Sequence, residues 1–321
     1  MTDPVRIKQL SVAHAHLRSA KRYVSLCLPS SLPDSRAALL EPGIELVRRS
    51  NKSMQKVHTL RPAVRAVLFD LDNTLVHRNQ SISRYASRFV DDFAHSLASV
   101  SPDTVAWLVN RQDNGGYLPS DSPFPTVRAA IAHSLVLDLP WRQIIQQEEI
   151  ATHWANCFPE CTVEMEGADA LCDRLVALGM RIGIVSNGAE KSRLATVERL
   201  SFRDRLSSVL SSERAGVRKP NAAIFQAAGR QLGVANDECV YVGDHPINDI
   251  AGALSAGMGA IWLEGFHLWP GEVSVNVPSV TSLSQVLDFV VEISARVTRG
   301  PSARAFSATT IRTPTGPSNE Q

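Results

Sequence analysis

Hydrophobic and polar positions divide the chain into stretches with different patterns. Residues 1–61 show no sustained apolar periodicity, and only residues 37–47 indicate a helix. Residues 67–69 form a short apolar run bounded by polar groups, which is typical of a buried strand. Helical spacing of apolar residues follows over 79–164, and from Gly167 helical and strand-like runs alternate up to residue 297.

Four amphipathic helices are predicted between residues 79 and 164, at 82–98, 103–109, 126–136 and 141–154. Asp103 and Pro140 stand where helices begin. No strand-like run interrupts these four segments. We therefore expect an all-helical insertion directly after the first strand.

The alternating part of the chain predicts an α/β fold. Helices are expected at 168–178, from 190, at 221–232, 247–254 and 282–297, and strands at 181–185, 206–210, 239–242 and 259–263. Strands that alternate with helices form a parallel sheet covered on both faces. In such sheets ligands bind beyond the carboxyl ends of the strands.

Composition indicates an ordinary globular protein, because 44% of the 321 residues are hydrophobic, 20% are charged, and the net charge is +1. No apolar run approaches the roughly 20 residues that span a bilayer, and residues 23–28 are too short for a signal-peptide core. The five cysteines are odd in number and have no framework spacing, so we expect a cytoplasmic protein.

Charge is concentrated at the N-terminus. Residues 1–61 hold eleven basic and four acidic residues, a net charge of +7, which leaves −6 for the remainder. They are expected to be a disordered extension, and nucleic-acid binding by this basic arm is the alternative. Translation could also begin at Met54. Residues 298–321, rich in Ser, Thr, Pro and Arg, are expected to be a disordered tail.

Two carboxylates, Asp70 and Asp72, follow the buried strand at 67–69. A carboxylate in this position loses hydration unless cations or donors compensate, and two so close together repel each other. Magnesium, a hard divalent cation with oxygen ligands, is the natural partner for the pair. The alternative is a strand that ends in an Asx turn, with Asn73 and Thr74 turning the chain.

Two later stretches carry groups that suit a phosphate. The strand-like run at 182–185 ends in Ser186 and Asn187, whose hydroxyl and backbone N–H groups fit a phosphate oxygen. Lys219 precedes Pro220, which is expected to occupy the first position of a helix. The ammonium of Lys219 would neutralise a nucleophile and a substrate phosphate together.

A fourth stretch ends in Asp244, with Asp249 five positions later. These four stretches, in this order over residues 65–265, resemble the four motifs of the haloacid dehalogenase-like (HAD) hydrolase superfamily. The resemblance implies a Rossmann-like core from residues 62–78 and 165–297. It also implies that residues 79–164 form a helical C1 cap, which closes over the active site.

The resemblance further implies a phosphatase mechanism. Asp70 would attack phosphorus and form an aspartyl-phosphate, while Asp72 would protonate the leaving alcohol and then deprotonate the hydrolytic water. Mg²⁺ would be held by Asp70, Asp244 and the backbone carbonyl of Asp72. Asp249 would hold a metal-bound water or orient Lys219.

Substrate contacts are expected from the core and from the insertion. Ser186, the backbone around Asn187, and Lys219 would bind the phosphoryl oxygens. In the turn-rich loop at 111–119, Arg111 would meet a second anionic group and Tyr117 would stack on a ring or sugar, the alternative being an ordinary surface loop.

A zinc site at His153, Cys157 and Cys161 is disfavoured, because Pro159 interrupts a helix that would align them and no fourth ligand is near in sequence. Core cysteines are expected there instead.

Single residues help to distinguish a phosphatase from enzymes of the superfamily that catalyse other reactions. Asp72 argues against a dehalogenase, which has no alkoxide to protonate. The absence of lysine between Lys56 and Lys191 argues against a phosphonatase, which needs a cap lysine. The alternatives that stay open are a phosphomutase, a dehalogenase despite Asp72, and a non-catalytic nucleic-acid-binding protein that uses the basic N-terminal arm. Sugar phosphates, phosphoglycolate-like acids and nucleoside monophosphates all fit as small phosphorylated substrates, without a membrane partner.

Overall fold

The computed structural model describes residues 64–118, 122–270 and 277–298. The predicted basic arm at 1–61 and the tail beyond residue 298 lie outside the described residues. Within the described part of the chain, no helix has the length and apolar character that would allow it to cross a membrane.

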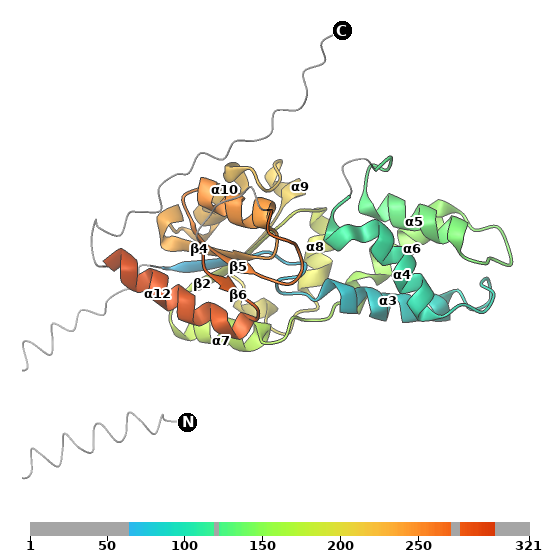
Figure 1. Cartoon of the computed structure of the whole chain (residues 1–321), viewed down its shortest axis with the longest axis horizontal. Coiled ribbons are helices and arrows are strands. Elements are labelled where there is room, and N and C mark those ends of the chain that lie inside the picture. Colours follow the sequence, from blue (N-terminus) through green and yellow to red (C-terminus); the bar gives the residue numbers. More distant parts are fainter. Residues whose placement is uncertain (1–63, 119–121, 271–276, 299–321) are drawn as a thin grey trace, which may run out of the picture. The chain divides into compact units, whose positions relative to one another are not determined.

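A six-stranded parallel sheet forms the core (Figure 1). Its order is β3-β2-β1-β4-β5-β6, so β1 lies between strands that follow it much later in the sequence. The α/β fold with a parallel sheet was predicted correctly. The strands are β1 (Ala66–Phe69), β2 (Arg181–Ser186), β3 (Ser208–Ser211), β4 (Cys239–Gly243), β5 (Gly259–Leu263) and β6 (Ser279–Val280).

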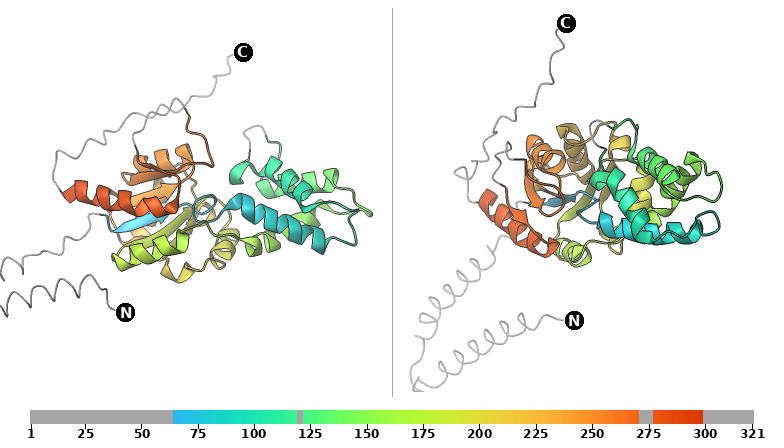
Figure 2. Two further views of the ribbon diagram at one scale, coloured as in Figure 1. Left: turned by 60° about the horizontal axis from the view of Figure 1, so that its bottom comes forward. Right: turned by 45° about the vertical axis from the view of Figure 1, so that its right-hand side comes forward.

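Alternate residues of β1 pack against different helices, because successive side chains of a strand point to opposite faces of the sheet. Val67 and Phe69 belong to one hydrophobic cluster, with residues of α7 (Ala168–Ala177) and α12 (Val286–Thr298). Ala66 and Leu68 belong to another, with residues of α10 (Ala222–Leu232) and α11 (Gly252–Ser255). Figures 1 and 2 show α7 and α12 on one side of the strands and α10 on the other.

From Ala168 onward, the described helices are α7 (Ala168–Ala177), which precedes β2, and α8 (Glu190–Val197), α9 (Ser212–Ala215), α10 (Ala222–Leu232), α11 (Gly252–Ser255) and α12 (Val286–Thr298), which follow it. Single 3₁₀ turns are η3 (Arg203–Arg205), η4 (Asn236–Glu238) and η6 (Leu283–Gln285).

Between β1 and β2 the described chain is helical, as predicted. The elements are α3 (Arg78–Asp92), α4 (Pro102–Asp113), η1 (Asn114–Gly116), α5 (Val127–Asp138), α6 (Gln147–Cys157) and η2 (Pro159–Cys161). Helices α3 to α6 pack consecutively on one another and enclose their own hydrophobic cluster. Ser101 and Thr126 cap α4 and α5 by accepting backbone N–H groups.

Two helices of this segment were predicted with wrong bounds. The first helix begins at Arg78 and ends at Asp92 rather than running over 82–98. The last begins at Gln147 rather than at Trp141, because Trp141 forms a β-bridge with Leu97 instead of a helical turn. Apolar periodicity extends over residues 93–98 and 141–146, but the chain is not α-helical there, and Leu97 pairs with Trp141 instead.

Three features of the core also differ from expectation. Pro220 precedes α10 by two positions, since Asn221 accepts the N–H of Ala223 as the N-cap. The helix expected at 247–254 begins as a π-helix, η5 (Pro246–Ala251). Strand β6 was not predicted, because two residues are too few to show a period.

Candidate active site

The carboxyl ends of β1, β2 and β4 bring the predicted polar residues to one edge of the sheet. Phe69, the last residue of β1, pairs with Ile184 of β2 and with Val242 of β4. Asp70 therefore leaves its strand beside the ends of both neighbours, and its N–H donates to the Val242 carbonyl at 2.9 Å. The connection from β1 leads to β2 on one side, whereas the connection from β3 leads to β4 on the other side. Open parallel sheets bind ligands where the strand order reverses in this way.

A buried lysine joins two of the carboxylates. The Nζ of Lys219 lies 2.6 Å from Asp70 Oδ1 and 2.6 Å from Asp249 Oδ1, and 3.0 Å from the Tyr241 hydroxyl. The side chains of Lys219 and Asp249 are completely buried. The Tyr241 hydroxyl donates to the Val185 carbonyl at 2.9 Å, which fixes the tyrosine. One ammonium thus serves two buried carboxylates.

Negative charge exceeds positive charge in this group. Oxygens of Asp70, Asp244 and Asp249 lie within 4.8 Å of one another. Burial raises the pKa of Asp70 to about 8, repulsion from the two other aspartates adds to the rise, and Lys219 opposes it. Burial likewise raises the pKa of Asp244. The oxygens of three buried carboxylates are the donors that a hard divalent cation prefers, and the single Lys219 ammonium leaves their negative charge only partly compensated. The residues therefore fit magnesium.

Local backbone structure places Asp249. A Cβ on Gly243 would lie 2.5 Å from the carboxyl carbon of Asp249, so only glycine allows this approach. The His245 N–H donates to Asp249 Oδ2 at 2.9 Å. The His245 ring in turn accepts the N–H groups of Ile247 and Asn248, which begins the π-helix.

Asp72 lies outside this carboxylate group and is bound by two arginines. Arg78 donates to Asp72 Oδ1 at 2.8 Å, and Arg193 forms an ion pair with Oδ2. Burial would raise the pKa of Asp72, but the guanidiniums of Arg193 and Arg78 outweigh it and hold the pKa far below its usual range. Arg78 also forms a bidentate pair with buried Asp113, at 2.6 and 2.5 Å.

Ser186 and Asn187 differ in what they contact. The Ser186 hydroxyl lies at the end of β2, 3.4 Å from a nitrogen of Arg193. The Asn187 amide accepts the Lys219 backbone N–H at 2.9 Å and donates to the Lys219 carbonyl at 3.1 Å. Asn187 therefore positions the segment that carries Lys219, a contact that spacing along the sequence did not indicate.

Of the two loop residues, only Tyr117 reaches the carboxylate region. Its ring contacts the rings of His245 and His267, at centroid distances of 4.9 and 5.7 Å. His267 Nδ1 is 2.7 Å from Asp244 Oδ2. Tyr117 thus joins the segment after η1 to the loops after β4 and β5.

Arg111 lies inside α4 rather than in the loop after it. Its guanidinium pairs with Asp138, lies 3.1 Å from the Ser134 hydroxyl, and stacks 4.9 Å from the centre of the Trp107 ring. These partners belong to α4 and α5, so the structure does not bring Arg111 to the carboxylates.

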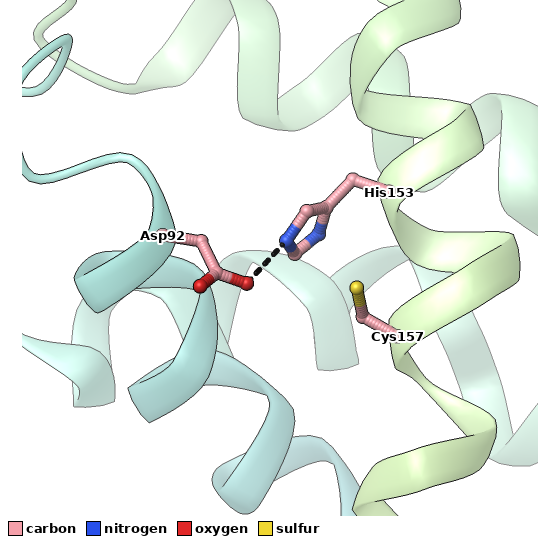
Figure 3. A group of neighbouring side chains, drawn as sticks. All are labelled: Asp92, His153 and Cys157. Atoms are coloured by element: carbon pink, nitrogen blue, oxygen red, sulfur yellow. Dashed lines mark hydrogen bonds and ion pairs between the residues drawn. The ribbon is translucent and has the colours of Figure 1, made fainter.

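A second group of possible metal ligands lies between α3 and α6. Figure 3 shows the His153 ring pointing toward Asp92, with Cys157 one turn further along α6. His153 is bonded on both sides, to Asp92 at 2.9 Å and to the Tyr85 hydroxyl at 3.0 Å. Asp92 also accepts from Arg88 at 3.2 Å. Protein partners thus engage both Asp92 and His153, and Cys161, the third residue of the disfavoured zinc candidate, is not in the group.

The sequence did not identify four residues of the site: Arg78, Arg193, Tyr241 and His267. A weak signal existed for Tyr241, because a hydroxyl in the middle of an apolar strand needs a partner. The arginines gave none, since an arginine on an amphipathic helix usually faces solvent.

Comparisons with known proteins agree with this geometry. A family model described as haloacid dehalogenase-like hydrolase matches residues 64–257, more than half of the chain. The glyceraldehyde 3-phosphate phosphatase of Pyrococcus furiosus is 33% identical over 204 residues, which cover 63% of this chain and 81% of that protein. The phosphoglycolate phosphatase of Rhodospirillum rubrum is 29% identical over 197 residues, 60% of this chain and 77% of that protein.

Solved structures share the fold. A dehalogenase captured as an intermediate complex is 19% identical, with a TM-score of 0.54 over 71% of this chain and 97% of that chain. The HAD-hydrolase YfnB of Bacillus subtilis, solved with magnesium bound, is 18% identical, with a TM-score of 0.51 over 71% and 98%.

Proposed function

The chain belongs to the haloacid dehalogenase-like hydrolases, and we propose that it is a magnesium-dependent phosphatase of small phosphorylated metabolites. The named relatives are phosphatases of glyceraldehyde 3-phosphate and of phosphoglycolate, both phosphoric monoesters. One observation carries the proposal: the Asp70 carboxylate is held by Lys219 within a buried group that has excess negative charge.

Asp70 is the proposed nucleophile. Its carboxylate attacks the phosphorus of the bound monoester and forms an aspartyl-phosphate, as the ester oxygen leaves. Lys219 holds one Asp70 oxygen in place and neutralises the charge that accumulates on the phosphoryl group. The Ser186 hydroxyl and the backbone around Asn187 bind the phosphoryl oxygens. Water then attacks phosphorus, which releases phosphate and restores Asp70.

Asp72 is the proposed acid and base. Its pairs with Arg78 and Arg193 hold it as a carboxylate, the form that accepts a proton from the attacking water. To protonate the leaving oxygen in the first step, it must first gain a proton, which requires that an arginine contact loosens. Substrate binding therefore has to rearrange this pair of contacts.

Asp70, Asp244 and Asp249 are the proposed side-chain ligands for magnesium. When bound, the cation neutralises the transferring phosphoryl group and the carboxylates around it. Lys219, His267 and the His245 N–H are protein partners of these carboxylates.

Helices α3 to α6 are the proposed cap. Tyr117 is the contact that supports this assignment, because it comes from that segment and packs on the rings of His245 and His267. The Asp72–Arg78–Asp113 chain also links the proposed acid to the end of α4. A cap over the site favours small substrates over phosphoproteins.

The test is phosphate release from sugar phosphates, phosphoglycolate-like acids and nucleoside monophosphates, with magnesium or with a chelator. We expect release to need magnesium, and Asp70→Asn to lower it by a factor on the order of 10³ or more, as loss of a nucleophile does. Asp92→Asn, in the second acidic group, is the matched control and should keep activity. Release by Asp70→Asn at the wild-type rate would refute the mechanism.

A further inference from the structure

Besides pairing with Asp72, Arg193 reaches a second part of the site. It lies on α8, and one guanidinium nitrogen bonds to Asp72 and lies 3.4 Å from the Ser186 hydroxyl. The positive charge is therefore between the proposed acid and a proposed ligand of the phosphoryl group. The side chain is 12% exposed, so it is mostly shielded from solvent but remains partly accessible.

Arg193 is not fully satisfied by the protein. Its Nε is buried and has no hydrogen-bond partner among the described residues. A buried donor without an acceptor is unfavourable, and most such groups in proteins are paired. Arg78 is the contrast, because its Nε and both terminal nitrogens all have carboxylate acceptors. Of the two guanidiniums on Asp72, only that of Arg193 has a buried nitrogen with no acceptor among the described residues.

The loop after β2 makes room for this side chain. A Cβ on Gly188 would lie 3.0 Å from Arg193 Nε and 3.3 Å from its Cζ, and the φ angle of Gly188 is +147°. A residue with a side chain would meet the guanidinium and adopt an unfavourable backbone conformation. Glycine at this position therefore permits the placement of Arg193.

We propose that Arg193 determines specificity by binding a second anionic group of the substrate, next to the transferred phosphate on the leaving-group side. The proposal rests on the phosphatase function, in which Asp72 faces the leaving oxygen. A planar guanidinium binds carboxylate or phosphate through two parallel hydrogen bonds. When Arg193 turns to that anion, Asp72 keeps its pair with Arg78. The substrates are phosphoric monoesters of short hydroxy acids, or short bisphosphates.

The experiment compares probes that differ only in the second anion: 2-phosphoglycolate, ethane-1,2-diol bisphosphate, and ethyl phosphate, which has none. We measure kcat/KM for wild type, Arg193→Gln, Arg193→Lys and the control Lys191→Gln, which removes an exposed charge from the same helix. Wild type and Lys191→Gln should prefer one of the anionic probes by about 10- to 100-fold, the range of a hydrogen-bonded charge.

In Arg193→Gln the preference should fall to within about threefold, and Arg193→Lys should restore part of it. The ratio between probes is the readout, because any effect on Asp72 changes all three rates together. Whichever anionic probe is favoured identifies the group as carboxylate or phosphate. An unchanged ratio in Arg193→Gln, or an equal fall for all probes, would overturn the proposal in favour of a role toward the transferred phosphate alone.

Failure of the phosphatase function is recognised separately. Wild type would then release no phosphate even from p-nitrophenyl phosphate, a monoester without a second anion. In that case, calorimetry of 2-phosphoglycolate and ethyl phosphate binding to the Asp70→Asn chain tests whether Arg193 binds a second anionic group. A dissociation constant about tenfold or more lower for 2-phosphoglycolate, lost on adding Arg193→Gln, supports the inference, and equal dissociation constants refute it.

Discussion

At the scale of single residues, the site consists of charged groups that would be unfavourable to bury alone and that compensate one another in ion pairs. Lys219 is stable in the interior because Asp70 and Asp249 accept hydrogen bonds from its ammonium. Burial by itself would lower the pKa of Lys219, but these two carboxylates outweigh it. Breaking a buried pair of this kind leaves an uncompensated charge, which typically costs about 3–5 kcal/mol. Substitutions here therefore affect folding as well as chemistry.

Asp70 gives a pH-dependent prediction for the metal-free chain. Its pKa is raised to about 8, so the folded state binds the proton more tightly than the unfolded state. The resulting stability is complete below about pH 4 and is lost as the pH rises toward 8. Because an amide cannot ionise, Asp70→Asn should remove this loss, so its free energy of unfolding should fall less than that of wild type between about pH 5 and about pH 8, whatever the absolute cost of losing the Lys219 pair.

Urea unfolding in the presence of a chelator, between about pH 5 and about pH 8, measures this difference. Asp92→Asn is the control, since hydrogen bonding by His153 lowers the pKa of Asp92 and reverses the sign of its contribution. If wild type and Asp70→Asn lose stability in parallel over this range, the raised pKa is wrong.

At the scale of elements, short loops position the site more than the strands do. Asn187 ties the loop after β2 to the segment before α10 through two hydrogen bonds with the Lys219 backbone. Gly188, the next residue, admits the Arg193 side chain from α8. Two consecutive residues of one loop thus place cations that come from different parts of the chain.

Gly188→Ala tests this arrangement. The added Cβ should displace the Arg193 guanidinium, so the preference for substrates with a second anion should fall as it does in Arg193→Gln. Stability should fall by about 1 kcal/mol or more, because the φ angle of +147° is unfavourable for alanine. Substrate preference from kcat/KM and unfolding in urea measure the two effects.

Gly179→Ala is the matched control, since its φ angle is +76° but no atom lies within 4 Å of the new Cβ. It should lose stability and keep substrate preference. A Gly188→Ala protein with unaltered preference would show that Arg193 tolerates the contact.

At the scale of the whole molecule, a cation would join segments that lie far apart in sequence. Asp70 follows β1, whereas Asp244 and Asp249 follow β4, and their carboxylates repel each other without compensation. Magnesium should therefore raise the melting temperature, since a ligand that binds only the folded state adds about 2.7 kcal/mol at a hundredfold excess over its dissociation constant.

Thermal unfolding with and without magnesium checks this linkage. Asp244→Asn should abolish most of the increase, whereas Asp92→Asn should keep it, because Asp92 belongs to the group between α3 and α6. If the rise in melting temperature is lost in Asp92→Asn but kept in Asp244→Asn, the main cation site is the group between α3 and α6.

Sequence patterns predicted the sheet and the carboxylates because both follow from local rules. Asp70, Ser186 and Asp244 each follow a buried apolar run, and parallel strands bring their carboxyl ends to one edge. Arg78 and Arg193 could not be predicted, because their roles depend on where a long side chain turns after the helices have packed. The position of Arg111 could not be predicted for the same reason. The sequence around it is compatible with a loop, but its ion-pair partner, Asp138, lies on α5.

The central place of β1 has a consequence for protein synthesis. This strand and Asp70 are synthesised before the other described strands, yet the neighbours of β1 in the sheet are β2 and β4, and β4 begins only at Cys239. A nascent chain that stops after α8 contains Asp70, Asp72 and Ser186 but lacks Lys219 and both later aspartates. The proposed nucleophile therefore gains its lysine and the two later carboxylates only when the sheet is nearly complete.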